Sequence, residues 1–421
     1  MGLAAAGSAA LQMTCGAQVM SSDSPKWWNV AASLNGFYDS NYTTTANKRG
    51  SAGFEVTPTA SLNVPLAQTD FGLTYTYDLQ YFQQRENLGV NPIDQSHTVG
   101  LWLDHSFNER WSAKLNEQLV SGQEPGLIGD TGNVYRLNGN NIANHATLEV
   151  DTEVTRQLST ALTFGNNFYD YNDDVDPTVS DFSYSAQLNR VENLLNFDLQ
   201  WHIAPETMAY VGYGFEIVNY TTDDPIGYEI VKGRLYSYVS DDRDNYSHLG
   251  YVGLQHNFLP NLVVAGKVGL QYNDAYNNPY YDSTSLSPYV NLSVIYTYLP
   301  GDNVQLGFTQ SRNATDVISI SQSNGSLTQD QESSSVHVSV NHKITSKLFV
   351  TAIGSYSAGT FNGGGYDSET DNDFGLGLGA NYAFTKNFSG NINYNYDNLS
   401  SDIAGRGYER NRISVGLSVA Y

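Results

Sequence analysis

Closely spaced aspartates are the residues of this chain that are most similar to a metal-binding motif in type and spacing. In the 421-residue sequence they recur at Asp173, Asp174 and Asp176, at Asp241, Asp242 and Asp244, and between residues 367 and 373. Carboxylates separated by one residue can chelate Ca²⁺, but none of these runs fills the glycine and distal glutamate positions of an EF-hand loop. We interpret them as solvated loop charge and keep Ca²⁺ binding in extracellular loops as the alternative. The sequence suggests no other cofactor.

Side chains that could catalyse a reaction do not fall into a catalytic arrangement. Hydrolases need a nucleophile with an adjacent base or a metal-binding histidine pair, and the sequence contains neither a GxSxG nor an HExxH motif. Three of the eight histidines stand in similar endings, LDHSF around His105, LQHNF around His256 and VNHKI around His342. This recurrence indicates a repeated structural unit. We predict that the chain is not an enzyme.

Alternation of apolar and polar residues is the pattern that must position these groups. It is clearest at the end of the chain, where small or polar residues separate Ile413, Val415, Leu417, Val419 and Tyr421. A period of two places the two sets on opposite faces of a strand. In water such an apolar edge would invite aggregation, whereas a strand that closes a barrel in lipid needs an apolar outer face. The ending also resembles the C-terminal insertion signal of bacterial outer-membrane barrels, with Tyr421 as its final aromatic residue.

The same alternation returns along the chain from Trp27 onward, and we count about eighteen such strands. An even number is typical of single-chain bacterial barrels. The predicted ranges are 28–38, 54–64, 71–81, 99–107, 111–122, 143–154, 159–171, 190–203, 207–220, 245–258, 261–273, 286–298, 303–312, 334–344, 347–358, 373–384, 387–397 and 408–421.

Connections between these strands alternate between short and long. Short ones include 108–110, 205–206, 259–260, 300–302, 345–346 and 385–386. Long ones include 40–51, 83–95, 123–142, 221–244, 313–333, 359–372 and 398–407. Short periplasmic turns and long extracellular loops are the asymmetry of outer-membrane barrels. We therefore predict an all-β fold, a transmembrane antiparallel up-and-down β-barrel of about 18 strands.

Composition narrows the environment of the chain. It contains 43 acidic and 20 basic residues, which gives a formal charge of −23 and argues against nucleic acid as a partner. A single cysteine cannot form an intrachain disulfide. No run of about 18 apolar residues occurs, so the sequence predicts no transmembrane helix, whereas barrel strands keep the average hydropathy polar.

The first 26 residues differ from the rest. Residues 1–26 contain a short stretch of small and apolar residues and are similar to a signal peptide, with cleavage expected after Ala17. The positively charged start of such a peptide is missing, because Lys26 is the first basic residue. We assign residues 1–26 to an N-terminal, signal-peptide-like segment and residues 27–421 to the barrel.

From about Trp28 to Tyr421 the sequence resembles outer-membrane β-barrel proteins of the porin type found in diderm bacteria. The resemblance rests on residues 28–42, on GFEVTP at 53–58, on NNI at 140–142, on RNATD at 312–316 and on RNR at 410–412. It implies an 18-stranded barrel in the bacterial outer membrane, surrounded by lipid and inserted by the barrel assembly machinery through its C-terminal strand. Porins of this kind are often homo-trimers.

Residues opposite the apolar faces would line the barrel interior. The pore-lining candidates are Glu55, Asp78, Asp104, Glu149, Asp151, Glu153, Glu192, Asp198, Glu216, Lys267 and Arg412. A barrel of this strand number is wide enough for an aqueous lumen, and acidic walls favour cations or neutral solutes. We predict a porin-like channel for passive passage of small hydrophilic solutes with a weak cation preference. The alternative is a dedicated poly- or oligosaccharide conduit, or a surface-adhesion barrel that uses the loops 123–142 and 221–244.

One residue does not fit the alternation. Glu117 has the parity of Leu115 and Leu119, which would place a carboxylate in lipid. We expect a bulge, an interfacial depth or an error of parity at this position.

Overall fold

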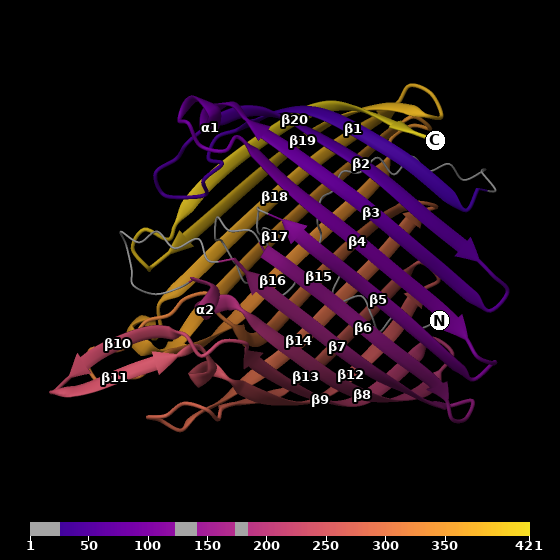
Figure 1. The fold of residues 1–421 in the computed structure, drawn as a ribbon. Helices are drawn as coiled ribbons and strands as arrows, with labels where there is room; N and C mark the ends of the chain where they lie inside the picture. Colours follow the sequence, from indigo (N-terminus) through magenta and orange to yellow (C-terminus); the bar gives the residue numbers. More distant parts are fainter. Residues whose placement is uncertain (1–25, 123–140, 173–183) are drawn as a thin grey trace.

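The computed structural model describes residues 26–122, 141–172 and 184–421. Eighteen strands form one closed antiparallel sheet, shown in Figure 1. They are β1 (Trp28–Asp39), β2 (Ser51–Pro65), β3 (Thr69–Phe82), β4 (Ile93–Ser106), β5 (Trp111–Gly122), β6 (Asn141–Glu153), β7 (Leu158–Tyr171), β8 (Arg190–Ala204), β9 (Thr207–Tyr220), β12 (Asn245–Leu259), β13 (Leu262–Ala275), β14 (Ser283–Leu299), β15 (Asp302–Ala314), β16 (Thr328–Lys343), β17 (Leu348–Gly363), β18 (Thr370–Ala383), β19 (Phe388–Ser401) and β20 (Tyr408–Ala420). Each predicted strand overlaps one of them, so the predicted all-β barrel fold is confirmed.

The ring closes between β1 and β20. These strands pair from Ala31 with Ala420 to Asp39 with Arg412. Beyond the last pair, Tyr421 and Val30 exchange two backbone hydrogen bonds of 2.9 and 3.2 Å. Because closure removes both edges of the sheet, every wall strand has a partner on each side.

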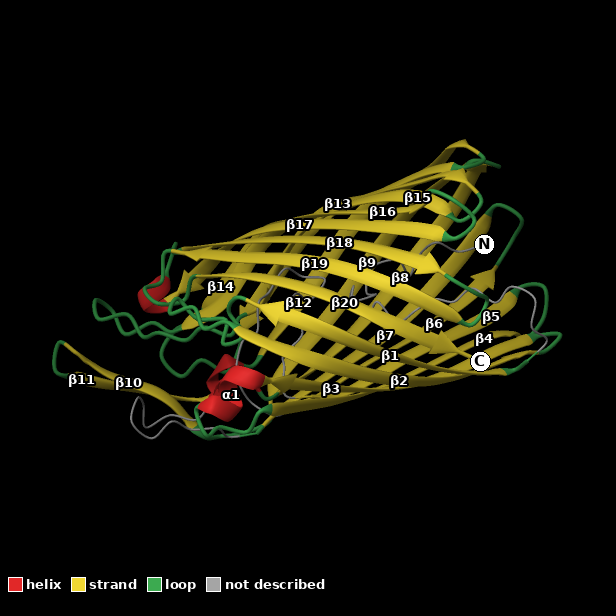
Figure 2. Ribbon diagram, turned by 90° about the horizontal axis from the view of Figure 1, so that it is seen from above, coloured by secondary structure: helices red, strands yellow, loops and turns green. Residues whose placement is uncertain are grey.

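Tight turns at one end of the barrel follow from their sequences. Thr155 accepts hydrogen bonds from the backbone N–H of residues 157 and 158, and Thr345 does the same for residues 347 and 348. Asn108 holds a third turn in the same way. Side-chain acceptors at the first position of a turn replace lost ladder bonds. The opposite end carries the longer connections, as Figure 2 shows.

Apolar residues cover the outside of the barrel. On β20, Val415, Leu417 and Val419 are all more than half exposed. On β1, Ser33 and Asn35 point inward and are 7% exposed, whereas Leu34 between them is 57% exposed. An apolar exterior with a polar interior is the reverse of a soluble fold and suits a bilayer.

Aromatic side chains mark both rims of the apolar surface. At the short-turn end, the rings of Trp28 and Tyr421 lie 5.8 Å apart. At the other end, the hydroxyl of Tyr75 lies 2.9 Å from a ring nitrogen of His97, and Tyr213 contacts His248 in the same way at 2.6 Å. Such belts sit at the boundary between lipid and water.

The long connections hold structure that the sequence pattern did not predict. A hairpin of β10 (Pro225–Val231) and β11 (Arg234–Val239) occupies the predicted loop 221–244 and projects beyond the wall in Figures 1 and 2. Short helices are α1 (Gln83–Asn87), α2 (Tyr184–Leu188), η1 (Ser240–Arg243) and η2 (Gly364–Tyr366). No helix in the described part of the chain is long and apolar enough to cross a membrane. The signal-peptide-like segment lies outside the described residues apart from Lys26.

Glu117 is placed on the outer face. Its Cα partners are Leu101 on β4 and Ala146 on β6, and both registers run without interruption through it. A bulge and an error of parity are therefore both wrong as explanations.

We predict that deleting Tyr421 impairs insertion and leaves ion selectivity unchanged in any barrel that does insert. The deletion removes two hydrogen bonds and a ring contact at the seam but no residue of the interior. The yield of heat-modifiable barrel in outer membranes measures insertion, and Tyr421→Phe is the matched control. Normal insertion of the shortened chain would contradict this role.

Candidate functional site: the barrel interior

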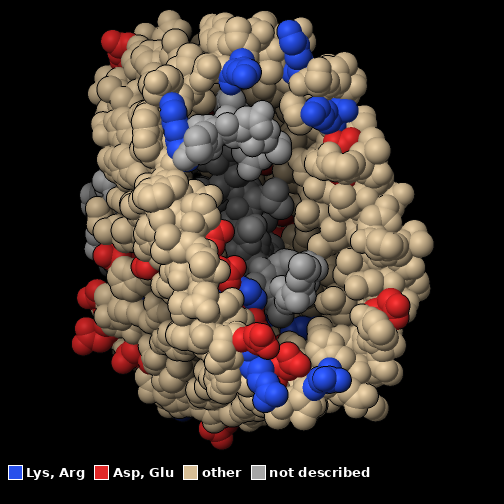
Figure 3. Space-filling model, turned by 90° about the vertical axis from the view of Figure 1, so that its right-hand side faces the viewer, with Lys and Arg blue, Asp and Glu red and all other residues tan. Residues whose placement is uncertain are grey.

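Charged residues on the inner wall form separate networks between strands. Figure 3 views the molecule from the short-turn end, where the wall surrounds a hollow with charged side chains of both signs at its rim. In one network, Arg412 of β20 donates to Glu55 of β2 at 2.8 Å and to Gln80 of β3 at 3.1 Å. Beside it, Thr57 donates to Asp78 at 2.8 Å. These contacts tie the strands next to the seam together from the inside.

A second network crosses the opposite wall. Asp198 of β8 accepts hydrogen bonds from Tyr251 of β12 at 2.7 Å and from Lys267 of β13 at 3.1 Å. The Tyr251 ring lies flat against the wall because Gly212 leaves room for it, and a Cβ there would fall 2.2 Å from the ring. Tyr210 lies over Gly253 in the same manner. Glycine is required at such close approaches of a ring to the backbone.

A third network lies near the short-turn end and is strongly acidic. Lys114 of β5 donates to Glu149 at 2.7 Å and to Asp151 at 2.9 Å. On the neighbouring strands Asp70 stands directly opposite Asp104. One lysine therefore faces several carboxylates along this part of the wall.

The remaining predicted pore-lining residues lie on β6, β8 and β9. Arg190 donates to Glu192 at 2.7 Å, and Glu216 accepts from Ser247 at 3.3 Å on the adjacent strands. Glu153 is exposed at the short-turn end of β6. The structure thus distributes the predicted pore-lining residues over several wall networks and does not gather them into one site.

An inward-folded segment, residues 311–330, is the feature of the interior that sequence reasoning missed. β14 and β15 stay paired only as far as Val290 and Gln310, although β13 and β14 remain paired well beyond that level. β15 and β16 stay together up to Ala314 and Asp330. β16 in turn stays paired with β17 as far as Thr328 and Gly363. The ladder therefore opens between β14 and β15, and the end of β15 stays attached to β16.

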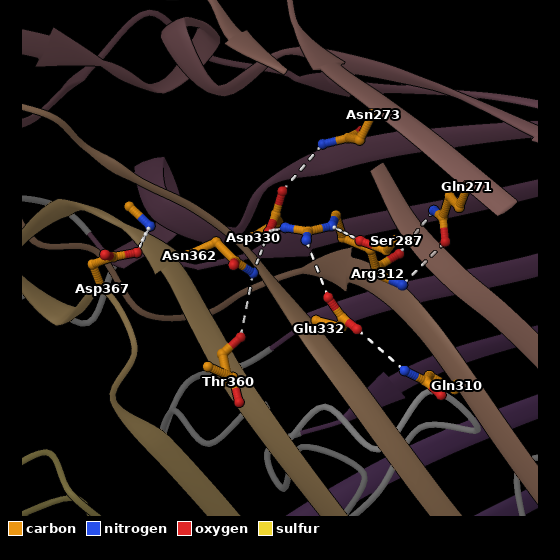
Figure 4. A network of polar contacts seen from close by, with 11 residues as sticks. Gln271, Asn273, Ser287, Gln310, Arg312, Asp330, Glu332, Thr360, Asn362 and Asp367 are labelled. Atoms are coloured by element: carbon orange, nitrogen blue, oxygen red, sulfur yellow. Dashed lines mark hydrogen bonds and ion pairs between the residues drawn. The ribbon is translucent and has the colours of Figure 1, made fainter. Parts of the chain in front are cut away.

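Side chains of β13 and β14 receive this segment, as Figure 4 shows. Gln271 of β13 accepts from the Arg312 N–H and donates to the Arg312 carbonyl, both at 3.1 Å. Asn273 of β13 donates to Asp330 at 3.1 Å. Ser287 of β14 accepts from the Arg312 guanidinium at 2.8 Å. A residue of β15 thus reaches over the inner face of β14 to bind β13.

Arg312, near the end of β15, also binds acidic residues of the neighbouring strand β16. Its guanidinium donates to Asp330 at 2.5 Å and to Glu332 at 3.2 Å. Arg312 is 8% exposed and Asp330 is 6% exposed, so the pair is buried. Removing one partner of a buried pair leaves an uncompensated charge, which costs about 3–5 kcal/mol.

Contacts on the far side extend the segment across the opening. Arg406, between β19 and β20, donates two hydrogen bonds to Asp316 at 2.8 and 2.9 Å, and it binds Asp371 at 2.7 Å. Arg243 of η1 donates to the Thr315 carbonyl at 2.7 Å and to the carbonyl of Gln187 in α2 at 2.9 Å. The segment is therefore anchored to β13, to the connection between β19 and β20, and, through Arg243, to the connections that contain η1 and α2.

Apolar packing supports the same region. Leu327 is buried against Tyr236 and Tyr238 of the β10–β11 hairpin. Tyr238 also donates to the Gly325 carbonyl at 2.8 Å. Gly325 has a φ of +82°, a conformation that glycine adopts without strain. The hairpin and the inward-folded segment thus form one small extracellular core.

The aspartates with chelating spacing serve a different purpose where the structure describes them. Asp242 accepts from the Val239 N–H at 2.8 Å, and Asp244 accepts from the Tyr220 N–H at 2.7 Å and from Asn219 at 3.1 Å. Among the described residues no three histidine, cysteine, aspartate or glutamate side chains converge on a possible metal position. Asp173, Asp174 and Asp176 lie outside the described residues, and Ca²⁺ binding stays a prediction there.

Comparisons with known proteins found one family model and several solved structures that are similar to this chain. Residues 312–421, which include Arg312 and the last five strands, match the family model described as Putative beta-barrel porin 2. OccAB4 of Acinetobacter baumannii is 12% identical, with a TM-score of 0.42 over 94% of this chain and 99% of that chain. OccK1 (OpdK) of Pseudomonas aeruginosa is 12% identical, with a TM-score of 0.45 over 94% and 99%. The copper transporter OprC is 11% identical, with a TM-score of 0.44 over 90% and 64%. No curated protein matches the chain.

The closed ring, the apolar exterior and the family match lead to one conclusion. A closed barrel satisfies every backbone group of its wall internally, as a bilayer requires, and the matched family consists of β-barrel porins by its description. The chain is a closed β-barrel with the exterior of a membrane-spanning protein, and its residues 312–421 match the porin family model.

We predict that Arg312→Ala releases the inward-folded segment and raises single-channel conductance. The substitution leaves Asp330 buried without its cation. The segment should therefore detach from β13 and β14, while the pairing between the wall strands persists. Planar-bilayer recording measures the change, and Arg110→Ala in an exposed turn is the control. An unchanged conductance in a folded barrel would show that this segment does not limit flow.

We also predict a pH-dependent effect of Asp242→Asn on the hairpin. Burial raises the pKa of Asp242 above its usual range, so the folded state binds the proton more tightly than the unfolded state. The stability contributed by this group is therefore present below the unfolded pKa and is lost as pH rises through the folded pKa. Asparagine keeps an acceptor for the Val239 N–H without the charge.

Hydrogen exchange of residues 225–243 should accordingly be equal or slower in Asp242→Asn at pH 7.5, and the difference should vanish near pH 4. Asp223→Asn, at an exposed position, is the control. Faster exchange in the variant at every pH would mean that the ionised carboxylate stabilises this region.

Proposed function

We propose that the barrel is a channel for passive passage of small hydrophilic solutes across the outer membrane, with a weak preference for cations. The observation that supports this proposal is the polar and predominantly acidic inner wall. Lys114 forms ion pairs with Glu149 and Asp151. It also stands opposite Asp104 in the register, but among the described residues neither Asp104 nor Asp70 forms an ion pair. Rings of carboxylates raise the local concentration of cations in a pore.

The inward-folded segment sets the size of solute in this proposal. Residues 311–330 cross the extracellular opening and are held by Arg312 and Arg406. An aqueous path between this segment and the opposite wall would admit small solutes and exclude folded proteins. The wall networks of Arg412 and Lys267 would line the path below it.

Insertion and assembly belong to the same proposal. The barrel assembly machinery would recognise β20, whose apolar outer face ends at Tyr421. In the membrane the barrel would contact outer-membrane lipids through its exterior and associate as a homo-trimer. Each subunit would keep its own pore because each ring is closed.

A surface-binding role is the second candidate. The β10–β11 hairpin exposes Tyr228, Ile230 and Leu235 to solvent at 60%, 65% and 55%. Apolar side chains on a projecting hairpin are typical of contact surfaces. This role would use the extracellular end and leave conduction to the lumen.

We predict that the double substitution Asp70→Asn and Asp104→Asn lowers the cation-to-anion permeability ratio about twofold, because it removes two facing carboxylates from the lumen. Reversal potentials in a salt gradient across a planar bilayer measure the ratio. Asp223→Asn removes a charge from an exposed loop and should leave the ratio unchanged. A wild-type barrel that never conducts would overturn the channel proposal itself.

A further inference from the structure

The β10–β11 hairpin presents an apolar face that the fold does not use. Tyr228, Ile230 and Leu235 are each more than half exposed. Ile230 pairs with Leu235, and Tyr228 lies two residues before Ile230 on the same strand, so the three side chains share one face. The other face carries Tyr236 and Tyr238, which are buried in the extracellular core. One face of the hairpin is therefore packed, and the other is uncovered in the part of the chain that the structure describes.

The turn between the two strands adds positive charge to this face. Lys232 and Arg234 flank Gly233 in the turn, and both are exposed. Neither forms an ion pair or a side-chain hydrogen bond with any described residue. The Arg234 guanidinium lies over the rings of Tyr236 and Tyr280, 5.0 and 5.3 Å from their centroids. These ring contacts position the guanidinium and leave its hydrogen-bond donors for a ligand.

Lys232 carries its charge in a backbone conformation that lysine rarely adopts. Its φ is +52° and that of Gly233 is +83°, as a two-residue type I′ hairpin turn requires. Asparagine, aspartate and glycine are preferred in such turns, whereas other residues with a positive φ are uncommon. An outlier of this kind is grounds for a functional hypothesis. Here it places a cation at the outermost point of the hairpin.

The hairpin points away from the membrane in which the barrel sits. In both Figure 1 and Figure 2 it projects from the end of the barrel opposite to the short turns. Its base is fixed, because Tyr238 donates to the Gly325 carbonyl. The Tyr280 hydroxyl also accepts from the Ser237 N–H and donates to the Ser237 carbonyl, both at 3.2 Å. The exposed face is thus held where it can contact a surface beyond the barrel's own membrane.

We infer that the hairpin binds the anionic lipid surface of a second membrane. The residues that make this contact, here called the hairpin tip, are Tyr228, Ile230, Lys232, Arg234 and Leu235. Apolar side chains enter the boundary between headgroups and acyl chains, and adjacent cations bind anionic headgroups. Residues 225–239 carry two cations and one carboxylate, so the hairpin is positive in a chain whose formal charge is −23.

The size of the hairpin tip favours lipid over a protein partner. A standard protein interface buries about 800 Å² and about 20–30 residues on each side, which is far more than the hairpin tip offers. A lipid surface requires no matching shape, because binding there follows from buried apolar area and charge. A few apolar side chains beside two cations are therefore sufficient for reversible binding.

This inference deepens the surface-binding role, the second candidate function, and rests on it. It is independent of conduction, because the hairpin tip lies outside the lumen.

Vesicle binding to intact cells tests the inference, because cells with the barrel in their outer membrane expose only its extracellular end. The probes are fluorescent phosphatidylcholine vesicles with and without phosphatidylglycerol. We expect cells with the barrel to bind vesicles that contain phosphatidylglycerol more than cells without it, and to bind pure phosphatidylcholine vesicles no more. Equal binding of the two kinds of vesicle would overturn the inference.

The double substitution Lys232→Asn with Arg234→Gln should weaken the binding of phosphatidylglycerol vesicles about tenfold. Asparagine suits the positive φ at position 232, so the turn should persist. Lys48→Asn with Arg49→Gln is the matched control, because it removes the same charge from the exposed connection between β1 and β2. Equal losses in both double variants would assign binding to the overall charge of the extracellular end and overturn the role of the hairpin.

Ile230→Thr with Leu235→Thr tests the apolar face separately. Threonine keeps the preference for a strand, so the hairpin should persist while its exposed apolar area falls and vesicle binding drops severalfold. Unchanged hydrogen exchange of residues 225–239 confirms that the hairpin is folded. Full vesicle binding by this variant would contradict the insertion of apolar side chains into lipid.

Two further measurements separate lipid from other partners. Binding of dextran sulfate, a soluble anionic polysaccharide, without binding of vesicles would keep the surface-binding role and overturn the choice of lipid. Clustering of barrels without vesicles, abolished by the Lys232→Asn and Arg234→Gln double variant, would assign the hairpin tip to a second copy of this chain and overturn the inference.

Conductance of the purified barrel should be the same in both hairpin variants as in the wild type. Altered conductance would contradict the independence of the hairpin tip from the lumen. A wild type that binds vesicles but never conducts would support the inference and overturn the channel proposal alone.

Discussion

The exclusion of water from a bilayer is the constraint on which the whole structure depends. In lipid each backbone N–H and carbonyl must find a protein partner, so a sheet can cross only as a closed ring. The pairing of β1 with β20 meets this requirement, and every other strand pairs with its two neighbours. Closure also fixes the faces, because alternate residues must then point to lipid or to the interior. The polar interior and the apolar exterior are therefore both consequences of closure.

Inside the ring a second requirement governs the charged residues, which must be paired where they are buried. Arg412, Lys267 and Lys114 each link strands of the wall. Arg312 and Arg406 use the same chemistry to hold an extracellular segment across the opening. One kind of interaction thus links the strands of the wall and holds the extracellular segment over the interior.

Sequence alternation predicted the strands, their faces and the closing strand, because the side-chain period of two is a local property. Arg412 and Glu55 could accordingly be assigned to the interior. Their contact could not be predicted, since it joins residues far apart in the chain through the register of three strands. The β10–β11 hairpin was missed because its strands are only seven and six residues long and their apolar residues pack on the distant Leu327. The inward course of residues 311–330 depends on Gln271 and Asn273 of a non-neighbouring strand. The local alternation of apolar and polar residues does not predict it.

The seam has a consequence for the order of folding. Most neighbouring strands are joined by a single turn or loop, so they can pair as hairpins soon after they meet. Ala31 and Ala420 come together only when the entire sheet has curled. Until then the curling sheet presents two bare edges, on β1 and β20, and lipid cannot satisfy either of them. A catalyst of insertion must shield those two edges. The pairing of one edge with the other is the step that would release the finished barrel.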